Sequence, residues 1–250
     1  MYRIVIPARY ASTRLPGKPL IRIAGRPLIQ WVYERARRSG AAEVLVATDD
    51  ERIAEAARGF GAEVVMTSIL HASGTDRIAE VAARRGWGDD EVVVNLQGDE
   101  PLMPESLIDQ AAGLLAAHAG AGIGTLAARI ATLGAYLDPN VVKVVTGAAQ
   151  RALYFSRAPI PWNRDTAPAG LASQRSFGHA RRHIGIYAYR TGALRRLAAL
   201  PPSPLEQLEK LEQLRALENG FDIRVADAAE MPGPDVNTPD DVARVEALLG

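Results

Sequence analysis

Short apolar runs rich in β-branched residues recur along the chain, and longer segments of good helix formers separate them. Each run is apolar at nearly every position, which is typical of strands that are buried on both faces. Strands of this kind form parallel sheets that helices cover on both sides. The runs lie at 2–7, 43–48, 63–67 and 91–96. The pattern therefore predicts an α/β fold with a doubly wound, mostly parallel sheet.

The helical segments and one change of pattern define the expected organisation. Several of the segments open with good helix starters such as Pro104 with Glu105. Between about 125 and 190 strand-like runs replace the helical pattern. We expect one domain over 1–250, with a strand-rich insertion or dimerisation region at about 125–190. The expected helices are 27–39, 50–59, 75–85, 104–118, 204–219 and 238–249, and the runs of the insertion are 141–146, 152–155 and 183–190.

Composition argues against several classes of function. Lys and Arg total 29 and Asp and Glu total 29, so the net charge is zero, and the basic residues are spread along the chain. Nucleic acid is therefore a poor candidate partner. The chain has no cysteine and no run of about 18 apolar residues, which fits a reducing compartment and no membrane partner. We expect a cytoplasmic protein.

The loop after the first predicted strand has a phosphate-binding composition. It brings three cations together, Arg9, Arg14 and Lys18, with the hydroxyls of Ser12 and Thr13. Arginine can fork onto phosphate oxygens, and lysine supplies a compact charge that can follow a transferring phosphoryl group. The alternative is an ordinary basic surface loop.

The fourth predicted strand ends in Asn95-Leu96-Gln97-Gly98-Asp99-Glu100-Pro101 and delivers two carboxylates to the carboxyl edge of the sheet. Ligands of open parallel sheets bind at this edge. Asp99 is well placed to hold Mg²⁺, which usually takes one or two carboxylates and substrate phosphates. The same residues could instead be a turn that starts a helix.

Two further segments are open to a binding and a capping interpretation. The segment 235–241 offers oxygen ligands, although capping is the better interpretation of Asp240 and Asp241. Residues 71–77 suit polar ligand contacts or helix capping equally. The chain has no P-loop, no Gly-x-Gly-x-x-Gly and no His-Glu-x-x-His, so these motifs give no support for P-loop hydrolysis, dinucleotide redox chemistry or a zinc hydrolase.

Seven segments together resemble the 3-deoxy-manno-octulosonate (Kdo) cytidylyltransferase family almost end to end. The resemblance implies a nucleotide-diphospho-sugar transferase fold and transfer of CMP from CTP to Kdo for lipopolysaccharide synthesis. It also implies Mg²⁺ as cofactor and a homodimer formed through 125–190. The segments are ARYASTRLPGKPL (8–20), HASGTDRIAE (71–80), VVNLQGDEP (93–101), DPNVVKVV (138–145), YFSRAPIPWNRD (154–165), RHIGIYAYR (182–190) and SPLEQLEKLEQLR (203–215).

The resemblance also implies roles for individual residues. Lys18, Arg14 and Asp99 would be catalytic, and Asp99 and Asn237 would hold the metal. The CTP site would consist of Arg9, Ser12, Thr13, Arg14, Lys18, Ser73, Arg77 and Gln97. The sugar site would consist of Arg157, Arg164, His183, Tyr187, Glu212 and Gln213.

One position departs from the family pattern. The family usually has an aspartate where this chain has Asn237, which keeps an oxygen ligand but loses a charge. We expect Asn237 to contribute to the metal site, through water or with help from Asp235. The departure leaves two alternatives open, namely another keto-sugar acid as acceptor, such as 8-amino-Kdo or a nonulosonic acid, and a non-catalytic nucleotide-binding homologue.

Overall fold

A mixed sheet forms the centre of the computed structural model, which describes residues 1–250 except 12–14, 72, 167–168 and 171–172. Along the main path of the sheet the strand order is β11-β7-β10-β6-β1-β4-β5. Neighbours on this path are parallel, except that β10 runs antiparallel to β6 and β7. The predicted α/β fold with a mostly parallel sheet is confirmed. The strands are β1 (Tyr2–Ala8), β4 (Glu43–Thr48), β5 (Glu63–Met66), β6 (Val92–Asn95), β7 (Ile123–Arg129), β10 (Arg181–Arg190) and β11 (Ile223–Asp227).

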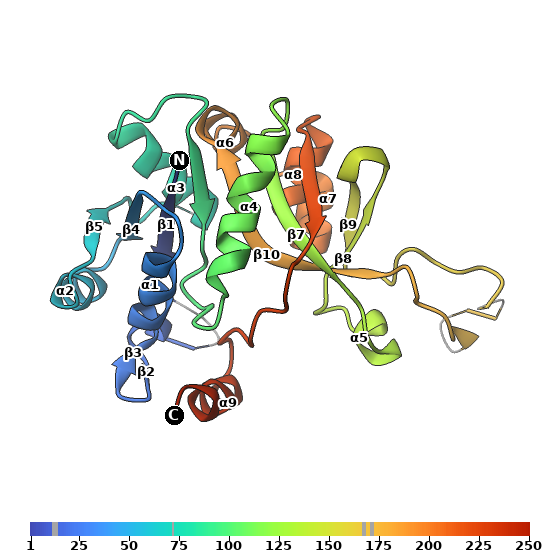
Figure 1. Ribbon diagram of the computed structural model, residues 1–250, viewed down its shortest axis with the longest axis horizontal. Coiled ribbons are helices and arrows are strands. Elements are labelled where there is room, and N and C mark those ends of the chain that lie inside the picture. Colours follow the sequence, from blue (N-terminus) through green and yellow to red (C-terminus); the bar gives the residue numbers. More distant parts are fainter. Residues whose placement is uncertain (12–14, 72, 167–168, 171–172) are drawn as a thin grey trace.

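Helices cover both faces of the sheet, as the continuous apolar strands predict (Figure 1). Ile4 and Ile6 of β1 face one layer, and Val5 between them faces the other, because strand side chains alternate. The first layer contains α1 (Leu28–Arg38), α2 (Glu51–Gly59) and α4 (Glu105–Ala117). The second contains α3 (Gly74–Arg84), α6 (Thr191–Ala198) and α8 (Gln213–Glu218).

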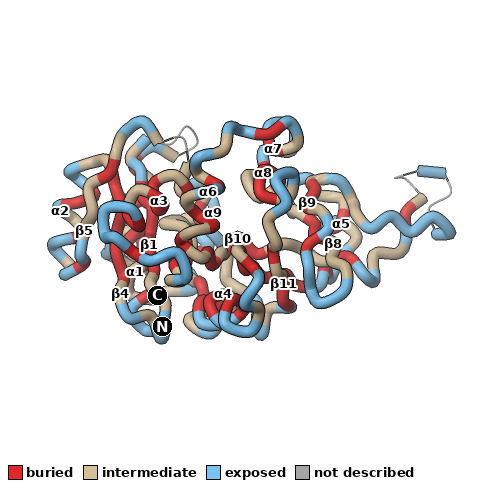
Figure 2. Tube along the Cα trace, turned by 90° about the horizontal axis from the view of Figure 1, so that it is seen from above, coloured by how far each residue is buried: buried red, intermediate tan, exposed pale blue. Residues whose placement is uncertain are grey.

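The segment 125–190 contributes to the main sheet and also extends beyond it. β7 and β10 lie inside the sheet, between β11 and β6. β8 (Lys143–Thr146) and β9 (Ala152–Ser156) pair beside β10, with the short helices α5 (Leu133–Leu137) and η2 (Ala148–Gln150) nearby. The described residues of the segment 157–180, which we call the arm, extend away from the body of the molecule (Figures 1 and 2). A dimer interface in this segment stays a prediction.

The predicted helix 204–219 is wrong in one respect, because it divides in two. α7 (Pro204–Glu209) ends where Lys210 adopts a left-handed backbone with φ 54°, and α8 begins at Gln213. The buried carboxylate of Glu206 accepts two hydrogen bonds from Arg215 and ties the two helices together. The turn between them places Glu212 at the edge of the sheet.

The C-terminal helix α9 (Pro239–Leu249) packs near β2 (Arg22–Ile23), which pairs with β3 (Arg26–Pro27). Thr238 caps α9 reciprocally with Asp241, so the predicted capping role of Asp241 is confirmed. Among the described residues, no helix combines the length and apolar character needed to cross a bilayer.

Candidate functional site

The carboxyl ends of β1 and β6 meet at the point where the strand order reverses, and a pocket of about 330 Å³ opens there. Crevices at such switch points are the usual ligand sites of open α/β sheets. Gly98 permits the close approach, since a side-chain Cβ there would lie 2.9 Å from the carbonyl oxygen of Pro7. This first pocket is lined by Pro7, Ala8, Arg9, Lys18, Pro19, His71, Ser73, Gly74, Arg77, Gln97, Gly98, Asp99 and Glu212.

Lys18, Asp99 and Asn237 converge at this edge from three distant parts of the chain. Gly17, in a left-handed conformation with φ 68°, turns the loop into η1 (Lys18–Leu20) and presents the lysine. Its Nζ donates to Oδ2 of Asp99 at 2.7 Å and to Oδ1 of Asn237 at 3.1 Å. The amide of Asn237 in turn donates to Asp235. The side-chain oxygens of Asp99 and Asn237 therefore both point at the ammonium group of Lys18.

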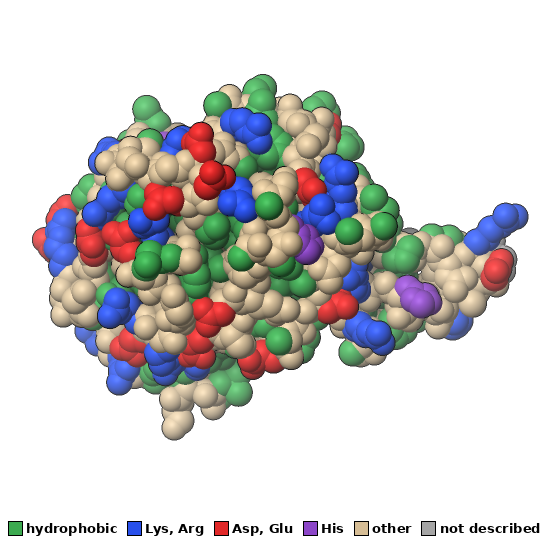
Figure 3. All heavy atoms as spheres, turned by 45° about the horizontal axis from the view of Figure 1, so that its top comes forward, with side chains coloured by type: hydrophobic (Ala, Val, Ile, Leu, Met, Phe, Trp, Pro, Cys, Tyr) green, Lys and Arg blue, Asp and Glu red, His purple; other side chains and the backbone are tan. Residues whose placement is uncertain are grey.

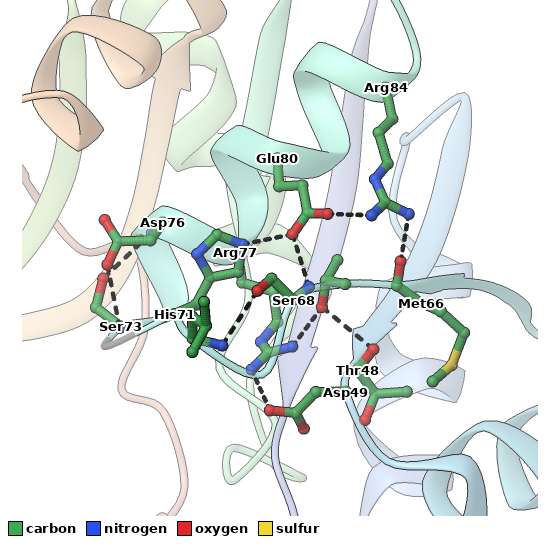
Figure 4. A network of polar contacts seen from close by, with 12 residues as sticks. Thr48, Asp49, Met66, Ser68, His71, Ser73, Asp76, Arg77, Glu80 and Arg84 are labelled. Carbon is green, nitrogen blue, oxygen red and sulfur yellow. Dashed lines mark hydrogen bonds and ion pairs between the residues drawn. The ribbon is translucent and has the colours of Figure 1, made fainter.

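Arg77 forms a buried cationic wall of the first pocket. It is only 3% exposed, and its guanidinium donates to Oδ2 of Asp49 at 2.8 Å and to the hydroxyl of Thr67 (Figure 4). Asp49 and Thr67 follow the ends of β4 and β5, so two neighbouring strands hold one side chain of α3. These anchors fix the direction in which Arg77 faces the pocket.

Glu80 holds the loop that precedes α3. Its carboxylate accepts from the backbone N–H of Ser68 at 2.9 Å and contacts both His71 and Arg84 (Figure 4). Burial alone would raise the pKa of Glu80, but the backbone hydrogen bond from Ser68 and the contacts with His71 and Arg84 keep it below its usual value. Ser73 begins α3 in a reciprocal capping box with Asp76. The capping interpretation of this segment is confirmed, and Ser73 still lines the pocket.

The carboxyl group of Glu100 has a strongly raised pKa. Burial, together with the negative charges of Asp99 and Asp235, raises the pKa of its carboxyl to about 8, although Arg182 opposes the shift. At pH 7 the carboxyl group of Glu100 is therefore mostly protonated, and the negative charge beside it comes from Asp99 and Asp235. A cation near Asp99 relieves the repulsion.

A second pocket of about 270 Å³ adjoins the first, and Gly74, Gln97 and Glu212 line both. Its floor is β10 and β6, and its walls come from the start of α3 and from the turn between α7 and α8. Its other lining residues are Thr75, Asn95, Ile123, His183, Gly185, Tyr187, Tyr189, Leu197, Lys210, Leu211 and Gln213.

Every second residue of β10 from His183 to Tyr189 faces this second pocket. The rings of His183 and Tyr187 lie 5.1 Å apart, and those of Tyr187 and Tyr189 lie 5.8 Å apart. A bulge between Ile184 and Tyr187 shifts the register with β7, a feature that often re-aims side chains beside active sites. Burial, with a smaller effect of Arg182, lowers the pKa of His183 to about 3, so its imidazole is neutral at pH 7.

Glu212 lies between the two pockets. Its carboxylate accepts from the hydroxyl of Thr75 at 2.8 Å, and burial raises its pKa above the usual value. The acidic group is thus held by the first turn of α3 and faces both cavities. It is positioned to contact a ligand in either one.

Two of the predicted sugar-site residues lie away from both pockets. Arg157 bonds to the end of α7, where its Nε donates to the carbonyl of Glu209 at 2.6 Å, and it also donates to the carbonyl of Pro139. Arg164 lines a separate hollow of about 310 Å³ in the arm. The space-filling view shows the arm projecting from the body with charged side chains at its tip (Figure 3).

The structure brings together most of the predicted residues and adds others. Arg9, Lys18, Ser73, Arg77, Gln97 and Asp99 line the first pocket, and His183, Tyr187, Glu212 and Gln213 line the second. Ser12, Thr13 and Arg14 lie outside the described residues. The sequence reasoning missed Asp49 and Asn95, which end or follow apolar strands just as Asp99 does. That position after or at the end of a buried strand was the available signal.

Comparison with known proteins gives concordant results. A family model described as "Cytidylyltransferase" matches residues 3–223. The 3-deoxy-manno-octulosonate cytidylyltransferase of Thioalkalivibrio sulfidiphilus is 55% identical over 99% of this chain and 98% of its own length. The protein of the same name from Alkalilimnicola ehrlichii is 56% identical over 99% of this chain and 96% of its own.

Two solved structures are also similar. A CMP:2-keto-3-deoxy-manno-octonic acid synthetase complexed with CTP matches with TM-score 0.88 and 43% identity, covering 100% of this chain and 98% of its own. A cytidylyltransferase from Leptospira borgpetersenii shares the fold, with TM-score 0.62 and 19% identity over 99% of this chain and 86% of its own.

Proposed function

Since the chain belongs to the family of 3-deoxy-manno-octulosonate cytidylyltransferases, we propose that it transfers the cytidylyl group of CTP to the anomeric hydroxyl of Kdo. The products are pyrophosphate and CMP-Kdo, the activated sugar for lipopolysaccharide synthesis. The observation that carries the proposal is the pair of adjoining pockets at the switch point, with Lys18, Asp99 and Asn237 gathered at their edge.

The first pocket suits CTP. Arg9 and Lys18 supply positive charge for the triphosphate. Ser12, Thr13 and Arg14, which lie between them in the sequence, stay proposals for the same site. Arg77, held rigidly by Asp49, together with Ser73 and Gln97 offers polar groups for the ribose and the base. Electrostatic groups that are fixed in advance stabilise charge without reorganising during the reaction.

The residues at the pocket edge fit Mg²⁺. The oxygens of Asp99 and Asn237 already converge on the Nζ of Lys18, so a divalent cation could be held by the same pair, with Asp235 assisting. No group of three or more His, Cys, Asp or Glu side chains that could hold a metal lies in the described part of the chain, so phosphate and water oxygens would complete the coordination. Bound Mg²⁺ would neutralise phosphate charge.

The second pocket suits the sugar acid. His183, Tyr187, Glu212 and Gln213 present neutral and acidic hydrogen-bonding groups to a ligand rich in hydroxyls. Gln97 and Glu212 line both pockets, so the acceptor hydroxyl would lie next to the nucleotide. Arg157 and Arg164 stay proposals for the sugar site, which would require the arm and the end of β9 to approach the pocket.

In the reaction, the anomeric oxygen forms a bond to the α-phosphorus of CTP and loses its proton. The bond from the α-phosphorus to the oxygen of the β-phosphate breaks, and pyrophosphate leaves. Lys18 and the arginines oppose the negative charge on the phosphoryl oxygens. Holding both substrates in adjoining pockets replaces a bimolecular encounter with a positioned one.

The test is pyrophosphate release from CTP with Mg²⁺ and Kdo, run beside UTP in place of CTP and beside 8-amino-Kdo and sialic acid in place of Kdo. We expect strong release with CTP and Kdo only. A preference for another acid would keep the chemistry and change the acceptor. Absence of pyrophosphate release with every acceptor would favour the non-catalytic nucleotide-binding homologue and refute the proposal.

Two further features stay proposals. The strand-rich segment and the arm would form a homodimer, which the molar mass in solution would test. A cytoplasmic location agrees with CTP as a substrate, and fractionation of the producing cells would test it.

A further inference from the structure

Asn95 is a buried polar residue inside an otherwise apolar strand. It ends β6 after three consecutive valines and is only 2% exposed. Its Oδ1 has no hydrogen-bond partner, which is a destabilising arrangement that native structures rarely keep without a reason. A leucine or valine would fit the pattern of the strand better. The amide therefore needs an explanation other than packing.

Tyr187 has the same property and lies directly opposite on the neighbouring strand. The two residues are paired in the antiparallel register of β6 and β10, and the hydroxyl of Tyr187 is also buried without a partner. Paired side chains on one face of a sheet lie close enough to interact. Although they are neighbours, the amide and the phenol do not bond to each other.

Both unpartnered groups line the second pocket. Their surroundings there are polar, since Gln97, Thr75 and Glu212 line the same cavity. Burial raises the pKa of Tyr187, with smaller contributions from Tyr189 and Glu212, so its phenol keeps a proton to donate. A ligand with hydroxyl groups could therefore receive a hydrogen bond from the phenol and donate one to the amide oxygen.

We propose that Asn95 and Tyr187 form a two-point clamp for one hydroxyl of the sugar-acid acceptor, and that Asn95 is a specificity-determining residue of the acceptor site. This inference rests on the proposed function. A site that hydrogen-bonds a hydroxyl discriminates strongly against an analogue that lacks it, because the buried groups are then left unpaired.

The central variant is Asn95→Leu, which has nearly the same shape and removes the unpartnered polar group. We expect the KM for Kdo to rise about tenfold or more, which corresponds to loss of one buried hydrogen bond to the substrate. The KM for CTP should stay within about twofold, and the melting temperature of the unliganded protein should be equal or higher, because an unsatisfied group is gone. A residue with a purely structural role would lower the melting temperature.

The matched control is Thr191→Val. This change removes a buried hydroxyl at the first residue of α6, directly after β10. That hydroxyl bonds to the carbonyl of Gly88 and lies outside both pockets. We expect it to lower the melting temperature and to leave both KM values unchanged. The two variants should therefore show opposite patterns.

Kdo analogues that each lack one hydroxyl identify the group that is clamped. The wild-type chain should reject one analogue, and Asn95→Leu and Tyr187→Phe should each lose most of that discrimination. Because both residues would bind the same hydroxyl, the double variant should lose less than the product of the two single effects.

The outcomes separate the two proposals. Wild-type protein that releases no pyrophosphate with CTP and Kdo would overturn the proposed function and this inference with it. Active wild-type protein with an Asn95→Leu variant of unchanged KM for Kdo would overturn the clamp alone. The clamp would also be overturned if Asn95→Leu lowered the melting temperature and raised the KM for Kdo and the KM for CTP by the same factor.

Discussion

Replacing Lys18 with alanine tests the central electrostatic feature of the site. The ammonium group bonds to Asp99 and Asn237, and it would move toward the phosphates when CTP and a metal enter the pocket. We expect the variant to fold and to bind CTP, but to turn over far more slowly.

The size of the effect follows from the exposure of the pair. The side chains of Lys18 and Asp99 are 16% and 28% exposed, so solvent partly screens them, and their ion pair contributes only about 1 kcal/mol to stability. In a chain of this length that is a change of about 2–4 °C in melting temperature. A positioned electrostatic group removed from a reacting centre typically costs about 3 kcal/mol in the transition state, or about 100-fold in rate.

The assay is initial-rate pyrophosphate release at saturating CTP and Kdo, with the melting temperature of each variant measured in parallel. Lys18→Arg is the matched control, because it keeps the charge but changes the shape, and it should recover part of the lost rate. A turnover within about threefold of wild type for Lys18→Ala would refute the assigned role. Loss of rate that is matched by a large fall in melting temperature would point to misfolding instead.

Three other predictions concern metal, nucleotide and pH. Asn237→Asp adds a charge to the oxygen pair and should lower the Mg²⁺ concentration for half-maximal rate; an unchanged or higher requirement in a titration would contradict this. Asp49→Ala leaves Arg77 buried and unpaired, so urea unfolding should show a loss of about 3 kcal/mol or more and a CTP titration should show a raised KM. Burial depresses the pKa of His183 from 6.5 to about 3, so its imidazole takes up a proton at a lower pH in the folded protein than in the unfolded chain. Stability should therefore fall as pH drops below about 6.5, by up to ~1.4 kcal/mol per pH unit, and urea unfolding of His183→Gln at pH 7 and 5 should show a smaller fall.

The sequence predicts the first half of the fold well because its strands carry continuous apolar runs. The predicted strands 2–7, 43–48, 63–67 and 91–96 correspond to β1, β4, β5 and β6 within one or two residues. The sequence reasoning did not identify β7 and β11 as strands. The run of β7 is rich in alanine, glycine and threonine, and β11 contains an arginine, so neither stands out as a β-branched segment.

The residues of the candidate site likewise include some that the sequence could predict and some that it could not. Lys18 and Asp99 could be predicted because polar residues that follow parallel strands meet at one edge of the sheet. The structure places Nζ of Lys18 2.7 Å from Oδ2 of Asp99. The roles of Asp49 and Asn95 depend on which groups lie opposite them in space. No local pattern predicts that Asp49 meets Arg77 across two strands, or that Asn95 lies opposite Tyr187 without bonding to it.

The two pockets are lined by different parts of the sequence, and this arrangement affects how the substrate preference of such a protein can evolve. The residues that line only the first pocket, for which we propose CTP, come from the first hundred positions. The second pocket, for which we propose the sugar acid, is lined largely by β10 and the turn before α8. Under these proposed assignments, substitutions on that one strand and turn would alter the preferred acid and leave the residues of the first pocket unchanged. Selection for a new surface sugar can therefore act on a small, separable part of the gene.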